Sequence, residues 1–453
     1  MSAEPVIVAG FGRTTRSAAT IQRPRRDSDV ARLLAGSEPR GVLARGLGRA
    51  YGDAAQNAGG VVLDMTGLDQ LGTLDLDRLT LRVGAGARLG MIEQHLLRRG
   101  LLLPVTPGTA HVTVGGAVAC DVHGKNHLSA GGFAEHVVAL ELESPGSGRF
   151  RLERARDQSA FNATTGGLGL TGVIVEATLR VRRVETAWMN VRHERCARAE
   201  ALLASLAEAA RHAAYANAWI DLTVGGRSLG RGIVSSADHA ALDQLPAAAR
   251  RRPLAEPTAR PCLPIPSWLA LARLGRGAIR AINAASWAAA ARGPESRLVP
   301  LTRALHPFDA LPGWVGLYGP AGVVQYQAAI PDGGEAALLS LLERVAEGPV
   351  APCIAALKRL GPSAGQLSFP LPGWSIAMDF PAAARGLASL LDALDELVAG
   401  AHGRVYLAKD ARLRSDHMPA MYPKLAEWRS ERDRLDPQRR ICSDLARRLR
   451  LLG

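Results

Sequence analysis

The sequence predicts an α+β fold with more than one domain. Between residues 40 and 180, short apolar β-like runs alternate with glycines, and one helical stretch, Met91 to Arg99, lies among them. From about Trp188 the pattern changes to an alanine-rich helical segment followed by further strand-like segments. A chain of 453 residues with 47% apolar and 21% charged residues has a globular composition, which excludes a disordered or collagen-like protein. At roughly 150 residues per domain, it forms two or three folded units.

The first region carries four strand-like runs, which predict an α+β or α/β unit. They read GVLARGLG at 41–48, GGVVLDMTGL at 59–68, LTLRVGAGARLG at 79–90 and TGVIVEATLRV at 171–181. Each run is bounded by glycine, which is typical of short strands joined by tight turns.

The second region begins near residue 188 with a helical pattern at 197–214 and a strand-like AWIDLTVG. A Pro/Arg-rich stretch and strands at 322–330 and 374–380 follow. From GRVYLAKD onward the chain predicts one strand and then charged helical segments, which need not belong to the second domain. We therefore expect domains at 1–187 and 188–403, with 404–453 as a separate return segment.

Charge and cysteine content restrict the class of protein. The net charge of +13 favours anionic partners such as phosphates or acidic lipids, without choosing among them. The cysteines are odd in number, widely spaced and never in a C-x-x-C pair, which argues against a disulfide framework and a zinc site; they are Cys120, Cys196, Cys262, Cys353 and Cys442. We expect no metal.

No targeting segment is evident in the sequence. The amino terminus lacks a charged region followed by a full apolar stretch, so no secretory signal is predicted. No uncharged apolar run reaches the roughly 20 residues that span a bilayer, since even Ala281 to Ala291 is bounded by Arg280 and Arg292. We expect a cytoplasmic protein or one peripheral on a membrane.

Three glycine clusters invite a nucleotide interpretation. Gly167-x-Gly169-x-x-Gly172 matches the dinucleotide fingerprint, but a strand-like segment follows instead of a helix, which disfavours a Rossmann domain. The cluster Arg45 to Asp53 follows a strand, and its small residues could form an anion-binding nest of backbone N–H groups or simply a tight turn. The third cluster, PGTAHVTVGGAVACDVHGKNH, starts at Pro107.

Six segments in order carry a resemblance to a known family. They are RGLGRAYGD, PGTAHVTVGGAVACDVHGKNH, GLGLTGVIVEATLRV, LYGPAGVVQYQ, PGWSIAMDF and GRVYLAKDARL with MYPKLAEW. Over nearly its whole length the chain resembles the flavin oxidoreductases of the vanillyl-alcohol-oxidase superfamily, and within it the decaprenylphosphoryl-β-D-ribose 2-oxidase branch of arabinan biosynthesis. The resemblance implies a two-part FAD-binding domain of the PCMH type and a substrate (cap) domain built on an antiparallel sheet with flanking helices.

The resemblance also implies which residues hold FAD. The Arg45–Asp53 loop would wrap the pyrophosphate, Gly172 and its neighbours would meet the adenine, and Tyr406 would contact the flavin. The full expected set is Arg45, Gly46, Leu47, Gly48, Arg49, Ala50, Tyr51, Gly52, Asp53, Gly108, Thr109, Thr113, Val114, Gly115, Gly116, Cys120, His123, Gly172, Ile174, Val175 and Tyr406.

Oxidation of an alcohol needs a base near the hydroxyl and donors that hold the sugar beside the flavin. Lys409 is the candidate base, although it could instead anchor a phosphate; an amine serves as base near neutral pH only if burial or nearby cations lower its pKa. Tyr51 and His123 could relay the proton or pack on the ring. The resemblance places Lys125, Tyr318, Gln325, Gln327, Lys358 and Ser375 against the substrate, lysines suiting a phosphodiester and glutamines ribose hydroxyls.

The chain departs from its relatives at three positions. Some superfamily members tether FAD through a histidine after the first G-x-G, where this chain has Arg49, and His123 matches a histidine that stays unattached in the resembled branch. We therefore expect noncovalent FAD. Mycobacterial enzymes carry Asn and Cys where this chain has Ser375 and Ala377, so the exact lipid or sugar is open.

A basic segment lies between Pro246 and Pro300 and contains nine arginines but only two glutamates. Within it, one predicted helical face carries three arginines and another carries apolar residues, weakened as a helix by two glycines. The residues are Arg273, Arg276 and Arg280 on the first face, Leu271, Leu274, Ala278 and Ile282 on the second, Trp268 and Trp287 flanking, and Gly275 and Gly277. This pattern is typical of an interfacial helix on an anionic membrane, or of an ordinary surface helix or loop.

Three functions follow as hypotheses. The first is FAD-dependent oxidation of the 2-hydroxyl of a polyprenylphosphoryl-β-D-ribose to the 2-keto sugar, the first half of epimerisation to the arabinose form, completed by a separate NAD(P)H-dependent keto-reductase. The second is an aldonolactone or soluble-sugar oxidase using oxygen, in which a tethering histidine is usual. The third is a non-catalytic lipid binder on a degenerate flavin fold. Nucleic acid is not an expected partner, because base-stacking aromatics are not interleaved with the arginines.

Overall fold

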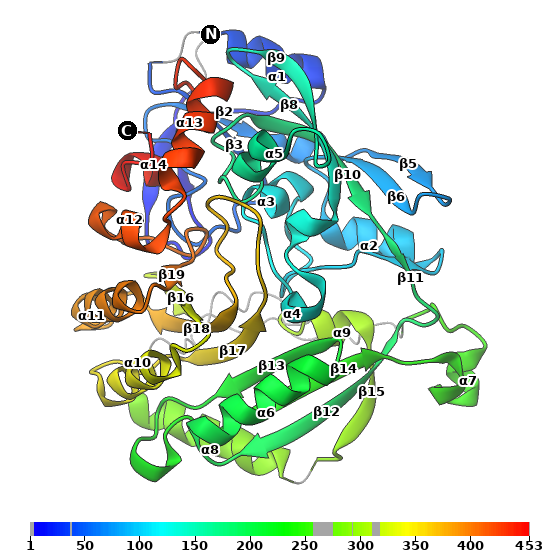
Figure 1. The fold of residues 1–453 in the computed structure, drawn as a ribbon, viewed down its shortest axis with the longest axis vertical. Coiled ribbons are helices and arrows are strands. Elements are labelled where there is room, and N and C mark those ends of the chain that lie inside the picture. Colours follow the sequence, from blue (N-terminus) through cyan, green and yellow to red (C-terminus); the bar gives the residue numbers. More distant parts are fainter. Residues whose placement is uncertain (1–3, 37–38, 257–274, 292, 310–317, 453) are drawn as a thin grey trace.

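The amino-terminal part of the chain folds into two sheets that pack side by side (Figure 1). The computed structural model describes residues 4–36, 39–256, 275–291, 293–309 and 318–452. The first sheet has the order β1 (Val6–Ala9), β2 (Arg16–Gln22), β4 (Val61–Asp64), β3 (Val42–Arg45), and β4 runs parallel to both β2 and β3. Helix α1 (Asp27–Ala35) buries Val30 and Leu34 beside it.

The second sheet is antiparallel and carries its own core. Its order is β5 (Leu71–Asp75), β6 (Thr80–Gly84), β10 (Val173–Arg180), β8 (Val137–Ser144), β9 (Gly148–Glu153). The helices around it are α2 (Leu89–Leu97), α3 (Val114–Ala119), α4 (His127–Ala130) and α5 (Gln158–Thr164). The G-x-G-x-x-G sequence leads into strand β10, so the strand predicted after it is confirmed.

The third sheet is the largest and is antiparallel throughout. Its order is β15 (Ser296–Pro300), β12 (Trp188–Cys196), β14 (Gly232–His239), β13 (Tyr215–Ile220), β17 (Ile354–Leu360), β18 (Gly373–Pro381), β16 (Val323–Pro331), β19 (Arg404–Val405). A short pair, β7 (Leu101–Leu102) with β11 (Arg182–Arg183), lies where the chain passes from the second sheet to the third. The α+β class predicted from the sequence is confirmed.

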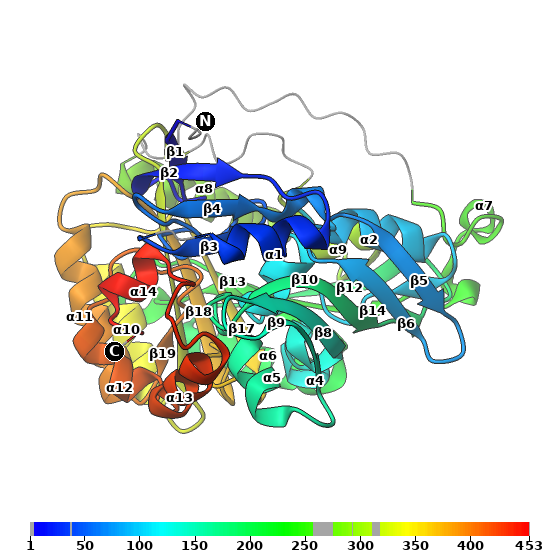
Figure 2. The ribbon, with the colours of Figure 1, turned by 90° about the horizontal axis from the view of Figure 1, so that it is seen from above.

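Helices cover both faces of this third sheet unevenly. Three long helices, α6 (Ala199–His212), α10 (Glu335–Glu347) and α11 (Leu387–Gly400), pack on one face. Helix α6 buries Leu202, Leu203 and Leu206, and each buried leucine contributes about 1.5–3 kcal/mol. On the other side of the sheet from α6 lie α8 (Arg276–Ala290) and α9 (Leu301–Leu305), as Figure 2 shows; α7 (Ala247–Arg250) projects beyond the sheet.

The carboxyl-terminal segment returns to the amino-terminal sheets after β19. It forms α12 (Met418–Met421), α13 (Leu425–Leu435) and α14 (Asp444–Arg448). The indole of Trp428 donates to the carbonyl of Ala163 (3.0 Å), and Arg448 pairs with Asp53 at 2.7 Å. Segments about 400 residues apart in sequence therefore pack on each other.

The basic segment contains a helix that begins later than the arginine pattern. Arg260, Trp268, Leu271, Arg273 and Leu274 lie outside the described residues, and α8 starts at Arg276, whose guanidinium donates to the carbonyls of Gly348 (2.9 Å) and Ala346. Ile279 and Asn283 form its buried side, while Ile282 is 47% exposed. Within the described ranges, no helix is both long and apolar enough to cross a membrane.

Candidate functional site

A cavity of about 1050 Å³ lies where the amino-terminal sheets, the third sheet and the segment after β19 meet. Its lining comes from the loop after β3, the segment from Pro107 to α3, the strands β13, β16, β17 and β18, and the residues that follow β19. We refer to it as the central cavity.

The glycine loop after β3 forms one wall of the central cavity. A Cβ at Gly46 would lie 2.1 Å from the hydroxyl of Thr113, and Gly48 has φ +64° against the guanidinium of Arg45. Arg45 donates to the carbonyls of Ala9 and Ala55, both at 2.7 Å. Only glycine permits this close packing at positions 46 and 48, where the backbone of the loop is exposed to the cavity between the side chains of Arg45, Leu47 and Arg49, as a pyrophosphate cradle requires.

The segment around Thr109 is held to the chain that follows α9. Asp309 accepts from the hydroxyl of Thr109 and from the backbone N–H of Ala110, both at 2.7 Å. Just before it, His306 and Glu93 form a buried ion pair at 3.1 Å, and this carboxylate raises the pKa of His306. These contacts hold the segment after α9 against α2 and the Thr109 segment, beside the cavity.

Alternation along the strands of the third sheet supplies the opposite wall. Because every second residue of a strand faces the same way, Gln325 and Gln327 of β16 share a face with Ser375, Ala377 and Asp379 of β18. The pairing of β17 with β18 adds Ile354, Ala356 and Lys358 to this face.

Two hydrogen-bonded groups occupy this wall. The amide of Gln327 donates to Nε2 of His123 (2.9 Å) and to the hydroxyl of Ser375 (3.1 Å). This donation assigns the ring proton to Nδ1 of His123, which has no partner among the described residues. Burial, with the charge of Lys358 next, lowers the pKa of His123 well below its usual value, so the ring is neutral.

The second group centres on the carboxylate of Asp379. It accepts from the amide of Gln325 (2.5 Å) and from the hydroxyl of Tyr318 (3.0 Å). Burial raises the pKa of Asp379, against these hydrogen bonds and the attraction of Lys409. The cavity thus contains a carboxylate as well as amines.

Three partly buried lysines line the central cavity. Burial lowers the pKa of Lys409 to about 8, against the attraction of Asp379, and its amine lies 4.1 Å from the centroid of the Tyr51 ring. Burial and the two neighbouring lysines lower the pKa of Lys358 to about 7. Lys125, whose pKa burial lowers to about 8, donates to the carbonyl of Ala304 (2.6 Å). Such a cluster attracts an anion and makes a neutral amine accessible near pH 8.

Aromatic rings close the cavity behind His123. Tyr406 and Phe369 stack with centroids 4.6 Å apart, and the hydroxyl of Tyr406 donates to the carbonyl of Cys120 (2.8 Å). Burial raises the pKa of the Cys120 thiol to about 11, so it is not a reactive thiolate.

Most of the residues predicted for the site line this cavity. They are Arg45, Gly46, Leu47, Gly48, Arg49, Ala50, Tyr51, Gly108, Thr109, Thr113, Gly116, Cys120, His123, Lys125, Gln325, Gln327, Lys358, Ser375, Tyr406 and Lys409. Tyr318 stands one step behind, against Asp379. Others fall outside the lining: Gly52, Asp53, Val114, Gly115, Gly172, Ile174 and Val175. Asp53 is turned to Arg448, which explains its position.

Several lining residues were absent from the sequence prediction, among them Asn217, Trp219 and Asp379. Asn217 and Trp219 come from β13, and Asp379 belongs to the PGWSIAMDF motif, where only Ser375 and Ala377 were considered. Alternation in AWIDLTVG could have identified the exposed face of β13, but not its neighbour in the fold. Within the described part of the chain, no group of three or more His, Cys, Asp or Glu side chains could hold a metal ion.

Comparison with known proteins gives matches over part and over all of the chain. Residues 18–151 match the family described as FAD binding domain. Decaprenylphosphoryl-beta-D-ribose oxidase of Mycolicibacterium smegmatis is 36% identical over 98% of this chain and 97% of its own length. An uncharacterised protein of Streptomyces coelicolor is 42% identical over 80% of this chain and all of its own. L-gulono-1,4-lactone dehydrogenase of Mycobacterium tuberculosis is 32% identical over 35% of this chain and 37% of its own.

Proposed function

We propose, because this chain belongs to the FAD-binding oxidoreductase family of decaprenylphosphoryl-β-D-ribose oxidase, that it oxidises a polyprenylphosphoryl-β-D-ribose. The 2-hydroxyl of the ribose becomes a ketone, which is the first half of epimerisation to the arabinose form. The products and substrate of this step carry a phosphodiester, so the site must hold both an anion and a sugar.

The convergence of three partly buried lysines with two glutamines in one cavity is the observation that carries this proposal. Lys125 and Lys358 suit a phosphodiester, since ammonium groups form charge-assisted hydrogen bonds with phosphate oxygens. The amides of Gln325 and Gln327 can donate to and accept from ribose hydroxyls. A neutral lactone carries no anionic group that these lysines could bind.

FAD is the cofactor, and we propose that it is bound without a covalent link. The cradle at Gly46 and Gly48, together with Thr109 and Thr113, would hold the pyrophosphate, and Tyr406 would contact the flavin. When bound, FAD supplies the acceptor for the hydride of the carbinol. Arg49 stands at the tethering position, with its guanidinium donating to the carbonyl of His111 (3.0 Å) and lying over the ring of Phe11. The proposed FAD domain comprises 1–187 and 404–453, and the substrate domain 188–403.

Lys409 is proposed as the base that takes the proton from the 2-hydroxyl. Its lowered pKa leaves a useful fraction of neutral amine near pH 7. Tyr51 packs against this amine, and its own pKa is raised far by burial, so it stays protonated. His123, whose pKa burial lowers and whose ring Gln327 holds in place, can orient a sugar hydroxyl or pass on the proton.

We also propose two partners that match the chemistry. A keto sugar must be reduced to finish an epimerisation, which calls for a separate NAD(P)H-dependent reductase. The exposed Arg280 and Ile282 of α8 suit peripheral contact with an anionic membrane, where a polyprenyl phosphate resides. Replacing Arg280 and Ile282 together by Glu should weaken binding to anionic liposomes most at low salt. Equal binding by the variant at every salt concentration would leave α8 an ordinary surface helix.

Anaerobic reduction of the flavin tests the proposed function directly. Farnesylphosphoryl-β-D-ribose should bleach the yellow protein, and free aldonolactones should not. Bleaching by lactones alone would support the soluble-sugar oxidase instead, for which the match to the lactone dehydrogenase covers only about a third of the chain. A protein that no sugar bleaches would be the non-catalytic binder.

A further inference from the structure

The sheet face that lines the central cavity continues beyond it. Trp219 of β13 pairs with Ala356 of β17 on one side and with Ile233 of β14 on the other. Ile233 in turn pairs with Arg195 of β12. A row of side chains therefore runs from Ala377 to Arg195 across five strands, about 19 Å at the usual strand spacing.

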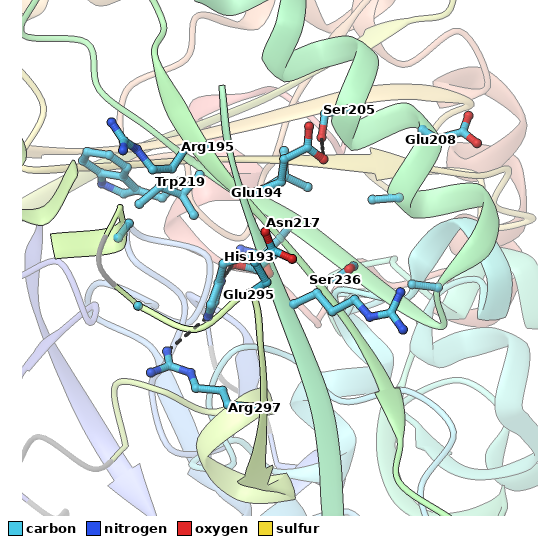
Figure 3. Close-up of a pocket in the computed structure, with 18 of the residues that line it drawn as sticks. His193, Glu194, Arg195, Ser205, Glu208, Asn217, Trp219, Ser236, Glu295 and Arg297 are labelled. Atoms are coloured by element: carbon cyan, nitrogen blue, oxygen red, sulfur yellow. Dashed lines mark hydrogen bonds between the residues drawn. The ribbon is translucent and has the colours of Figure 1, made fainter. Parts of the chain in front are cut away.

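A second cavity, of about 1410 Å³, lies partly over the far part of this face and partly on the α6 side of the sheet, where Ser205, Glu208 and Ser236 line it. It shares Asn217 and Trp219 with the central cavity, so the two spaces meet at β13. Figure 3 shows Trp219, Asn217 and His193 among its lining residues, with Arg195 beside Trp219 and Arg297 hydrogen-bonded to His193. The cavity also wraps the outer edge of β12, because β15 pairs only with Trp188 to Arg192, and the last contact on that edge is the backbone N–H of His193, which donates to the carbonyl of Glu295 (3.1 Å).

Helices α8 and α9 cover two parts of the same face, and the uncovered part between them forms a groove. On one side two contacts hold α8 against the sheet. The amide of Asn283 donates to Asp221 (2.8 Å), and the guanidinium of Arg195 lies 4.1 Å from the centroid of the Trp287 ring. On the other side α9 packs Leu301 and Leu305 into a small core. Between them, Trp219 and Ile233 remain only half-buried although they point to the inner face of the sheet.

The groove combines an apolar floor with a polar border. Ile233, Trp219 and the alanines at the end of α8 provide the apolar surface. Along the border, Nδ1 of His193 is 2.9 Å from the hydroxyl of Ser235, and Arg297 reaches its Nε2 at 3.1 Å. The outer end carries exposed side chains of both charges, among them Arg195 and Arg297 beside Glu194 and Glu295.

We propose that this groove receives the polyprenyl chain of the substrate, an inference that rests on the proposed function. With the ribose at the flavin and the phosphate at Lys358, the chain attached to that phosphate must leave the central cavity. Lys358 stands on the same face as Ala356, which is the partner of Trp219 in the sheet. Ala356, Trp219 and Ile233 therefore offer the first isoprene units an apolar floor that leads from Lys358 towards the outer edge of the sheet.

A chain-length series tests the groove. The ratio of kcat/KM for farnesylphosphoryl ribose to that for methylphosphoryl ribose, measured by anaerobic flavin reduction, should be at least about tenfold in the natural protein. Ile233→Glu should bring this ratio close to one, because a carboxylate would face the chain. Ile7→Glu, at a residue 69% exposed on β1, is the matched control and should keep the full ratio.

A second variant guards against loss of folding. Ser235→Trp fills the groove without adding charge and should also abolish the advantage of the longer chain, and retention of yellow FAD and of the melting temperature shows that each variant is folded. An unchanged ratio in a folded variant, or no chain-length gain in the natural protein, would overturn the groove while leaving the oxidation intact. A natural protein that no ribose substrate bleaches would overturn the proposed function, and the groove with it.

Discussion

The substitution Lys409→Ala distinguishes a catalytic role of this lysine from a role in substrate binding. An exposed lysine, with a pKa of about 10.4, is about 0.04% neutral at pH 7, whereas a pKa of about 8 gives about 10%. Burial thus makes the neutral amine about 250 times more abundant. If this amine is the base, its removal should lower kcat by a factor of about 100 or more while FAD stays bound.

The pH dependence of the activity tests the same role of Lys409. The base acts when neutral, so activity should rise nearly tenfold between pH 6 and 7 and level off above about pH 8. Lys409→Ala should lose this rise. Asp379→Asn should move the midpoint to lower pH, because the carboxylate of Asp379 stabilises the charged amine.

Stopped-flow reduction by farnesylphosphoryl ribose, with enzyme and substrate kept anaerobic, measures the chemical step. Lys358→Ala is the matched control, since Lys358 is an equally buried lysine in the same cavity and should mainly raise KM. If Lys409→Ala also raises only KM and leaves kcat and its pH profile unchanged, Lys409 is a phosphate anchor and not the base.

Three further outcomes follow from particular residues. Acid precipitation should leave the yellow colour in the supernatant, because Arg49 replaces a tethering histidine; colour in the pellet would contradict this. Nitroaromatic substrates should leave no stable adduct on the natural protein, since Ala377 has no nucleophile, whereas Ala377→Cys should gain one without losing sugar oxidation, as intact mass spectrometry can show. Asp436→Asn should destabilise the fold by about 3 kcal/mol, because it removes the fully buried one of the two carboxylates that pair with the fully buried Arg432; thermal unfolding with Asp433→Asn, at the half-exposed partner of Arg432, provides the comparison.

The basic segment shows what a sequence pattern cannot predict about individual side chains. The pattern around Arg276 predicts one charged helical face, and a helix is present from that residue on. Yet Arg276 is used to hold the carbonyl of Gly348, so it is not a free surface charge. A helical period identifies which residues share a face, but not which of those side chains find a partner far along the chain.

The sequence by itself determined the α+β class, the flavin family and the chemical types of the site residues. Glycines at 46 and 48 and lysines at 125, 358 and 409 are recognisable in sequence because the chemistry depends on their identity. Only the tertiary structure decided that Asp379 accompanies Lys409, and that Asn217 and Trp219 join two cavities. The physical reason is that a strand's alternation selects a face locally, whereas burial and long-range pairing decide what that face meets and how far a lysine's pKa falls.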